Sequence, residues 1–235
     1  MTIFLKLCLA HLIADFLLQF EELYQLKLKS ILGHAIHASL HGVVSLILLY
    51  PYLDEPFIWI FLAVMTVVHF IQDVNKYRFI STKKWLFPLF TGDQILHVLA
   101  LATIFFFPIS REIRGFPDKL LLNYFYVEKE WTLYAMSFLT TTFLAAFFLH
   151  SFRISYLPYE RQDPFITNLE MRHGLIERSL VTGIFIFASN PLILILSPAA
   201  GLFRLPFPLL RNAVNFFLSY GFAVAIGLLY RMWLF

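Results

Sequence analysis

Long apolar runs recur along the whole chain, and they limit its fold more than any other feature. About seven of them are long enough to cross a bilayer, which takes about 20 apolar residues in a helix. They lie near 3–20, 30–50, 57–77, 91–107, 131–152, 175–196 and 209–233. Backbone polar groups inside a bilayer must bond within the protein, so such runs form helices. The sequence therefore predicts an all-α membrane protein, a bundle of about seven transmembrane helices.

The composition agrees with a membrane protein. Of the 235 residues, 60% are hydrophobic and 14% are charged, whereas soluble domains carry roughly 25% charged residues. The net charge of +3 is small and the basic residues lie mainly between the apolar runs, so they indicate topology and no nucleic-acid partner. The single cysteine, Cys8, excludes an intrachain disulfide and a zinc site built from several cysteines.

The chain is expected to form one membrane domain in two parts. Residues 1–109 would form a core of the first four helices, and residues 110–235 would add three further helices with polar connecting loops. Lysine and arginine side chains are enriched in the loops on one side of this arrangement. By the positive-inside rule, that side is cytoplasmic, which puts the N-terminus outside and the C-terminus inside.

Three histidines share one face of the second apolar run. His34, His37 and His41 are spaced at i, i+3 and i+7, which places them within roughly a 60° sector of a helix. Ionisable side chains inside a membrane helix are costly and usually functional. The second run is therefore expected to contribute to a functional site.

Polar residues of the first four runs are predicted to meet at one leaflet. They lie late in the first and third runs and early in the second and fourth, and successive helices run in opposite directions. The residues concerned are His11, Asp15, Gln19, His34, His37, His41, His69, Asp73, Asp93, Gln94 and His97. With the N-terminus outside, this leaflet is the cytoplasmic one.

The first four runs also suggest an internal repeat of two helical hairpins. The pattern H-x-x-x-D occurs in both the first and the third run, and the second and fourth runs carry matching polar positions. The matched pairs are His11 with His69, Asp15 with Asp73, His37 with His97, and His34 with Gln94. A parallel duplication of this kind is known among membrane proteins.

The clustered residue types favour a metal site. Imidazole and carboxylate groups are standard ligands of divalent transition metals, zinc before iron, manganese or nickel, and helical bundles bind one or two such ions between facing helices. The predicted ligands are His11, Asp15, His37, His69, Asp73 and His97. An aspartate that is not a ligand, among Asp15, Asp73 and Asp93, would act as general base. His34, His41, Gln19 and Gln94 would support the ligands or contact substrate.

The expected activity is metal-dependent hydrolysis of a lipid or lipid-linked substrate at the cytoplasmic leaflet. In the second half of the chain, Arg153, Arg172 or Arg178 would bind a phosphate or carboxylate head group. Alternatively, Glu177 and Arg178 pair with charges on neighbouring helices. The H-x-x-H-H boxes of membrane di-iron enzymes and the H-E-x-x-H motif of metalloproteases are both missing from the sequence.

Two other functions fit the same residues. The cluster can form the path of a transporter or channel for metal ions or protons. It can also brace the bundle of a non-catalytic membrane subunit through hydrogen bonds between helices.

Three motifs in the first hundred residues resemble a known family. They are H-L-I-A-D-F-L-L-Q from His11 to Gln19, H-F-I-Q-D-V-N-K from His69 to Lys76, and D-Q-I-L-H from Asp93 to His97. Together with the histidine-rich second run, they resemble an uncharacterised family of bacterial and phage membrane proteins. The resemblance implies a shared polar site and a bacterial inner membrane, and it implies no established activity.

Overall fold

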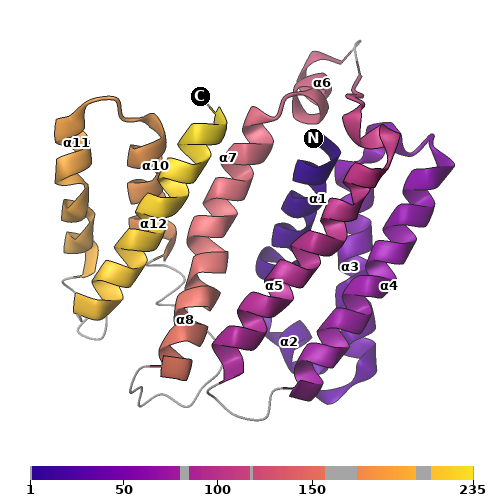
Figure 1. Cartoon of the computed structure of the whole chain (residues 1–235), viewed down its shortest axis with the longest axis horizontal. Helices are drawn as coiled ribbons and strands as arrows, with labels where there is room; N and C mark the ends of the chain where they lie inside the picture. The colour runs from indigo at the N-terminus through magenta and orange to yellow at the C-terminus, as the bar shows by residue number, and fades with distance from the viewer. Residues whose placement is uncertain (1, 80–84, 117–118, 157–173, 205–212, 235) are drawn as a thin grey trace. The chain divides into compact units, whose positions relative to one another are not determined.

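A computed structural model of the chain describes residues 2–79, 85–116, 119–156, 174–204 and 213–234. These residues are mostly helical and include no strand, which confirms the all-α prediction (Figure 1). The chain divides into two compact units, residues 1–136 and 137–235. The segment 110–136 belongs to the first of these units.

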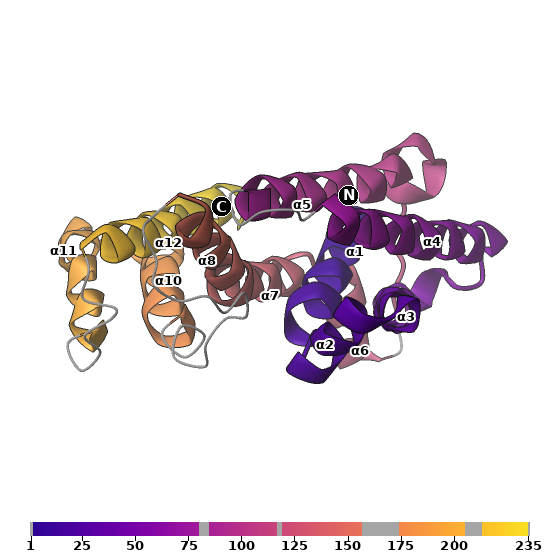
Figure 2. The same cartoon turned by 90° about the horizontal axis from the view of Figure 1, so that it is seen from below.

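The first unit begins with a helix that changes its winding. α1 (Thr2–Leu12) continues as a π-helical turn, Ile13–Leu17. The helices that follow are α2 (Glu21–Lys29), α3 (Ile31–Leu48), α4 (Pro56–Phe79), α5 (Leu86–Ala102), α6 (Leu120–Val127) and α7 (Glu130–Leu139). α1 packs against α3 and α5, and α4 packs against the same two helices (Figure 2). The four helices α1, α3, α4 and α5 therefore form a closed ring.

The second unit contains α8 (Ala145–Tyr156), α10 (Ser179–Phe187), α11 (Pro191–Leu196) and α12 (Ala213–Leu234). Two π-helical turns, Thr140–Leu144 and Gly174–Arg178, precede α8 and α10. Within this unit, α10 packs along α12. Thr182 lies at their contact and donates its hydroxyl to the carbonyl oxygen of Ala223.

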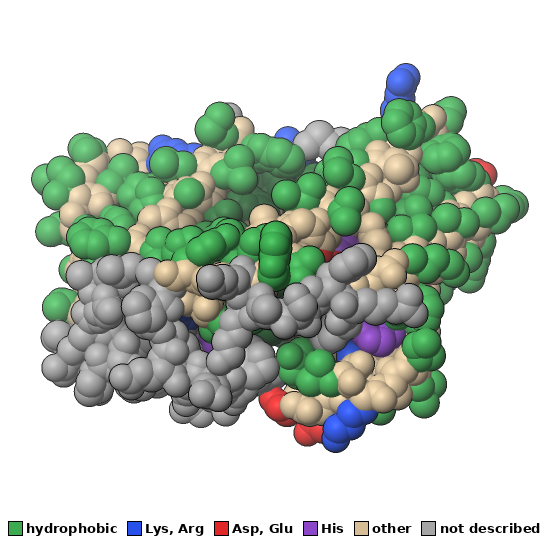
Figure 3. All heavy atoms as spheres, turned by 60° about the horizontal axis from the view of Figure 1, so that its bottom comes forward, with side chains coloured by type: hydrophobic (Ala, Val, Ile, Leu, Met, Phe, Trp, Pro, Cys, Tyr) green, Lys and Arg blue, Asp and Glu red, His purple; other side chains and the backbone are tan. Residues whose placement is uncertain are grey.

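Among the described residues, five helices are long and apolar enough to span a membrane. They cover Ile31–Leu48, Pro56–Lys76, Leu86–Phe106, Glu130–Tyr156 and Phe216–Leu234. Thr2–Leu17 and Glu21–Lys29 add a sixth if the pair, which is bent by 87°, counts as one span. Hydrophobic side chains predominate among those described on the face in Figure 3, as expected for contact with lipid.

The count is lower than the predicted seven because the run at 175–196 is interrupted. α10 ends at Phe187, and Asn190 has an extended backbone with φ −82° and ψ 120°. Asn190 precedes Pro191, and a residue before proline is disfavoured in the helical region. Its side chain then caps the short α11 by accepting from the backbone N–H of Leu192.

α2 lies almost perpendicular to α1 and is held close to the start of α3. Ser30 caps α3 by accepting from the backbone N–H of Gly33 at 3.2 Å. A Cβ atom at Gly33 would lie 2.5 Å from the carbonyl carbon of Leu26 and from the nitrogen of Lys27. Glycine is therefore required for the two backbones to approach this closely. The contact sets the position of Lys27.

The first unit has a hydrophobic core at the end opposite α2, whose position Figure 1 shows. Its core contains Ile3, Leu7, Leu49, Tyr52, Ile58, Phe61, Leu62, Ile104 and Ile109. The buried Tyr52 hydroxyl donates to the carbonyl oxygen of Glu112 and accepts from the backbone N–H of Arg114, both at 3.1 Å. Burial raises the pKa of Tyr52. The guanidinium of Arg114 forms ion pairs with Asp54, Glu55 and Glu112. Ion pairs therefore join the segment around Arg114 to the turn between α3 and α4.

Candidate metal centre

Asp15 is the centre of the polar cluster. It lies in the π-helical turn Ile13–Leu17, and π-turns inside helices occur frequently at functional sites. Its carboxylate is buried, with 8% of the residue exposed. Nε2 of His37 and Nε2 of His41 both donate to Oδ1 of Asp15, at 3.0 and 2.8 Å. One carboxylate oxygen is thus shared by two imidazoles from adjacent turns of α3.

The other carboxylate oxygen of Asp15 faces α1 and α5. Nε2 of His11 lies 3.6 Å from Oδ2 of Asp15. Gln94 donates its amide nitrogen to the same oxygen at 3.3 Å and accepts from Nε2 of His11 at 3.2 Å. Gln94 therefore bridges the histidine and the aspartate that lie one turn apart on the first helix.

His69 completes the group from α4. Its Nε2 lies 3.8 Å from Oδ1 of Asp15, and this buried atom has no hydrogen-bond partner among the described residues. The imidazole rings of His41 and His69 are in contact, with centroids 3.6 Å apart. His69 is thus directed at Asp15 without forming a bond to it.

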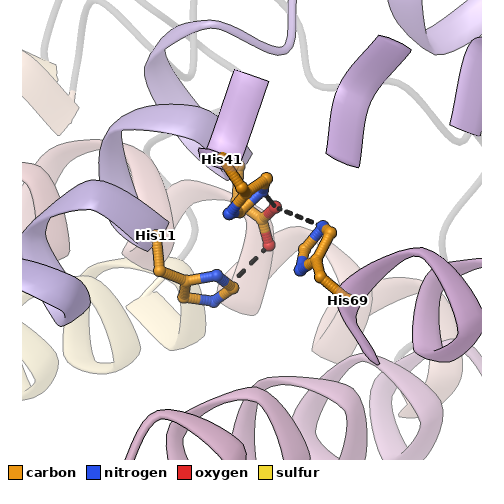
Figure 4. A group of neighbouring side chains, drawn as sticks. His11, His41 and His69 are labelled. Carbon is orange, nitrogen blue, oxygen red and sulfur yellow. Dashed lines mark hydrogen bonds and ion pairs between the residues drawn. The ribbon is translucent and has the colours of Figure 1, made fainter. Parts of the chain in front are cut away.

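Four residues from three helices and the π-turn present potential ligand atoms at one point. His11, Asp15, His41 and His69 each offer one such atom, and these atoms lie within 4.8 Å of one another. Figure 4 shows the three histidine side chains directed toward the carboxylate. All four residues are buried. Three imidazoles and one carboxylate form a donor set that suits zinc, iron or manganese.

His97 lies beside this group but outside it. Its ring centroid is 4.3 Å from that of His69 and 4.9 Å from that of His11. Nδ1 of His97 donates to the carbonyl oxygen of Asp93 at 2.8 Å. The opposite ring nitrogen, Nε2, is buried and has no hydrogen-bond partner in the described part of the chain.

The other two aspartates form ion pairs with lysines, of which Lys27 is buried and Lys76 is partly exposed. The ammonium of Lys27 lies 2.9 Å from Oδ2 of Asp73, and that of Lys76 lies 2.8 Å from Oδ2 of Asp93. Asp73 also accepts from Nδ1 of His34 at 2.7 Å. Asp73 and Asp93 are therefore neutralised by cations of the protein itself.

The predicted residues come together, with a different division of roles. The structure places His41, which the sequence suggested as a supporting residue, in the group of four that could hold a metal ion. It places the predicted ligand Asp73 against a lysine, and it places His37 in a hydrogen bond to Asp15. Gln19 lies further out, where it accepts from the ammonium of Lys27 at 2.9 Å.

The two hairpins contribute unequally, although their sequence patterns match. Asp15 is surrounded by imidazoles, whereas its predicted counterpart Asp73 is bound by Lys27. His37 donates to a carboxylate, whereas its counterpart His97 donates to a backbone carbonyl. A sequence repeat, if present, is not reflected in equivalent contacts at these positions.

Sequence reasoning missed the two lysines as members of the site. The sequence presents both as cations that indicate topology, and Lys76 also as the last residue of a family motif. The spacing did contain a clue, since Lys76 follows Asp73 by one helical turn at the end of an apolar run. Nothing in the sequence indicated that Lys27, on a separate helix, would reach the same cluster.

The predicted head-group residues lie in the second unit. Nε and Nη2 of Arg178 donate to the carbonyl oxygens of Thr141 and Thr142, at 2.7 and 2.9 Å. The accepting residues belong to a π-helical turn, whose altered winding displaces carbonyls from the regular helical pattern. Arg153 and Glu177 are also buried. Binding of a head group by Arg153 or Arg178 stays a prediction, and Arg172, the third predicted residue, lies outside the described residues.

Comparison with known proteins gives one family match, which covers the first part of the chain. Residues 3–116 match the family described as "Protein of unknown function (DUF3307)", which confirms the resemblance inferred from the motifs. The chain matches no curated protein and no solved structure. The matched segment includes every helix that contributes to the cluster around Asp15.

Proposed function

We propose that this membrane protein binds one divalent transition-metal ion, with zinc as the leading candidate, through His11, Asp15, His41 and His69. We further propose that it uses this ion to hydrolyse a lipid or lipid-linked substrate. The observation that carries the proposal is the buried carboxylate of Asp15, which is surrounded by imidazoles while the neighbouring aspartates have lysine partners.

The balance of charge in the cluster supports a cation at Asp15. Three buried carboxylates, Asp15, Asp73 and Asp93, accompany two ammonium groups, Lys27 and Lys76. Counting the aspartate and lysine side chains alone, one negative charge is left over, and it belongs to Asp15. Among the described residues, no lysine or arginine forms an ion pair with Asp15. A buried carboxylate without a lysine or arginine partner is costly at membrane depth even when it accepts hydrogen bonds, and a bound metal ion would offset that cost.

The same balance favours hydrolytic chemistry over a purely structural ion. A divalent ion changes the net charge of the cluster from one negative to one positive. An ion held by these four residues would therefore leave the cluster with a net positive charge, which would favour deprotonation of a bound water molecule. Metal ions of this kind lower the pKa of bound water to about 7 and polarise carbonyl or phosphoryl oxygens. The nucleophile and the electrophilic assistance for ester, amide or phosphodiester hydrolysis would both come from one ion.

A lipid substrate fits the position of the cluster along the helices. The candidate ligands lie at the α2 end of a ring of membrane-spanning helices, away from the apolar core at the opposite end. With the N-terminus outside, this end faces the cytoplasmic leaflet of a bacterial inner membrane. Substrates that share the bilayer, or head groups at its surface, can reach this depth.

Elemental analysis of the purified full-length protein tests the metal proposal. Protein in detergent is stripped with a chelator, reconstituted with zinc, and compared with the variant Asp15→Asn, which keeps the shape of the side chain and removes its charge. We expect about one equivalent of zinc in the wild type and loss of most of it in the variant, as for removal of a direct ligand. Less than about a tenth of an equivalent in the reconstituted wild type would reject the proposal.

Hydrolysis is tested separately, with the metal-loaded protein in nanodiscs of bacterial lipid extract. Mass spectrometry of the lipids before and after incubation would reveal a released head group or fatty acid. We expect neither product in samples that contain the Asp15→Asn variant or a chelator. A fully loaded protein that leaves all lipids intact would restrict the proposal to metal binding.

A further inference from the structure

A small cavity adjoins the candidate metal centre on the side of the apolar core. Its volume is about 30 Å³, and its polar lining includes His11, His41, His69, His97 and Gln72. Apolar side chains of α1, α4 and α5 form most of the remaining wall. On this measure a cavity of about 10–15 Å³ is enough for one water molecule, so the cavity has room for one.

Two acceptor atoms belong to residues that line this cavity. The carbonyl oxygen of Asp93 can only accept, so Nδ1 of His97 carries the hydrogen of that bond, and Nε2 of the neutral ring is a bare acceptor. The amide oxygen of Gln72, Oε1, is an acceptor as well. Both atoms are buried, and neither has a hydrogen-bond partner among the described residues. His97 itself is only 4% exposed.

An unpaired buried acceptor is unfavourable, and two of them beside one cavity call for a ligand that donates twice. A metal ion at His11, Asp15, His41 and His69 would lie beside this cavity, because three of these residues also line it. Water is a small molecule that can both donate two hydrogen bonds and bind a metal ion. Its oxygen can bind the ion while its two O–H groups donate to His97 and Gln72.

We propose that the cavity is the binding site of the exchangeable ligand of the ion, a water molecule held by Nε2 of His97 and Oε1 of Gln72. This inference rests on the proposed metal centre. It makes His97 and Gln72 positioning residues that act on the ligand of the ion. It also explains why the chain has a glutamine at position 72, between the histidine and the aspartate of the third apolar run.

The proposed site should prefer a ligand that can donate hydrogen bonds over one that can only accept them. Water donates to both acceptors, whereas an anion without hydrogen atoms, such as azide, would face two acceptor lone pairs. Azide is therefore expected to bind the ion weakly in the wild type. Removing one of the acceptors should weaken the hold on water and relieve the repulsion of azide, so that azide binds more tightly.

Cobalt substitution makes this measurable, because the visible absorption of Co²⁺ reports both its coordination and its binding of azide. The purified protein in detergent is loaded with Co²⁺ and titrated with azide, in parallel with Gln72→Met and Thr66→Val. Thr66 lines the same cavity, but its hydroxyl already donates to the carbonyl oxygen of Leu62, so its removal is the matched control. All three proteins should bind the same amount of cobalt.

We expect azide to bind Gln72→Met about fivefold more tightly than the wild type, the change typical of losing one neutral hydrogen bond. Thr66→Val should stay within about twofold of the wild type, because its own bond lies within the helix. Equal azide affinity in all three cobalt-loaded proteins would overturn the proposal. Loss of cobalt from His97→Gln would also overturn it, by making His97 a ligand of the ion.

These outcomes are distinguishable from failure of the proposed function. If the wild type binds neither cobalt nor zinc, the metal centre itself is rejected, and the water site falls with it. If cobalt binds and the azide affinities are equal, the metal centre stands and only the ligand site is wrong.

Discussion

The ammonium nitrogen of Lys27 lies 2.9 Å from Oδ2 of Asp73, in a pair whose side chains are only 2% and 5% exposed. Lys27 belongs to the bent helix α2, whereas Asp73 lies near the end of the long helix α4. The pair therefore joins α2 to the ring of helices. It also neutralises a carboxylate that the sequence alone presents as a metal ligand.

Lys27→Met should destabilise the first unit. Breaking a buried ion pair by removing one partner leaves an uncompensated charge and costs about 3–5 kcal/mol. Thermal unfolding in detergent, followed by far-ultraviolet circular dichroism, measures the loss. The double variant Lys27→Met/Asp73→Asn should be more stable than the sum of the two single effects predicts. Simple additivity would show that the two residues do not interact.

Metal titration separates the roles of the aspartates. Asp15→Asn removes a ligand and should lose most of the bound zinc. Asp73→Asn removes a charge that Lys27 already balances, so it should keep a full equivalent, with affinity reduced by about 10–100-fold at most. Zinc loss from Asp73→Asn equal to that from Asp15→Asn would return Asp73 to the ligand set.

Gly33→Ala tests the close contact between α2 and α3. The added Cβ would meet backbone atoms of Leu26 and Lys27 at 2.5 Å, and the backbones must separate. We expect a loss of about 1–3 kcal/mol, in the range typical of overpacking. Gly221→Ala in α12 is the matched control, because its Cβ would meet nothing within 4 Å. Alanine in a helix interior should be neutral or stabilising there, by up to about 1 kcal/mol.

Tyr52 makes the stability of the first unit depend on alkaline pH. Burial raises the pKa of Tyr52 in the folded protein above that in the unfolded chain, which is about 10. Its contribution is therefore complete below about pH 10 and is lost as the pH rises through the folded value. Tyr52→Phe should cost about 1–3 kcal/mol at pH 8, because it leaves the backbone groups of Glu112 and Arg114 unpaired.

The measurement is the melting temperature of the wild type and of Tyr52→Phe between pH 8 and pH 11. The difference in melting temperature between the two proteins should become smaller above about pH 10, since only the wild type loses the stabilisation by the phenol there. A constant gap across this range would show that Tyr52 does not titrate with folding.

If the protein were a transporter, zinc ions or protons would cross the membrane through the polar cluster. The structure favours the opposite outcome, no flux. The polar cluster ends in the apolar core that contains Leu7, Leu49 and Phe61. We therefore expect liposomes with the reconstituted protein to pass neither zinc nor protons above the rate of empty liposomes. Fluorescent indicators inside the vesicles measure both. Flux that disappears with His37→Ala would favour a transporter over a hydrolase.

The helical class and the residues of the cluster could be predicted from the sequence. Apolar runs of membrane length can only form helices, and the alternating direction of successive helices brings His11, His41 and His69 to one end whatever the details of packing. The resemblance over the first hundred residues follows from the same motifs. These conclusions depend on length and periodicity, which are local properties of a sequence.

The roles within the cluster required the tertiary structure. Whether an aspartate binds a metal or a lysine depends on which side chains reach it. Lys27 reaches Asp73 because α2 turns by 87° from α1 and Gly33 lets it approach α3. Asp15 lies in a π-helical turn, which directs its carboxylate toward the histidines. A helical wheel assumes regular α-helical spacing and therefore does not predict this orientation. Which aspartate is available to a metal ion thus depends on contacts between segments that are distant in the sequence. The sequence pattern predicts only that the aspartates and histidines lie close together.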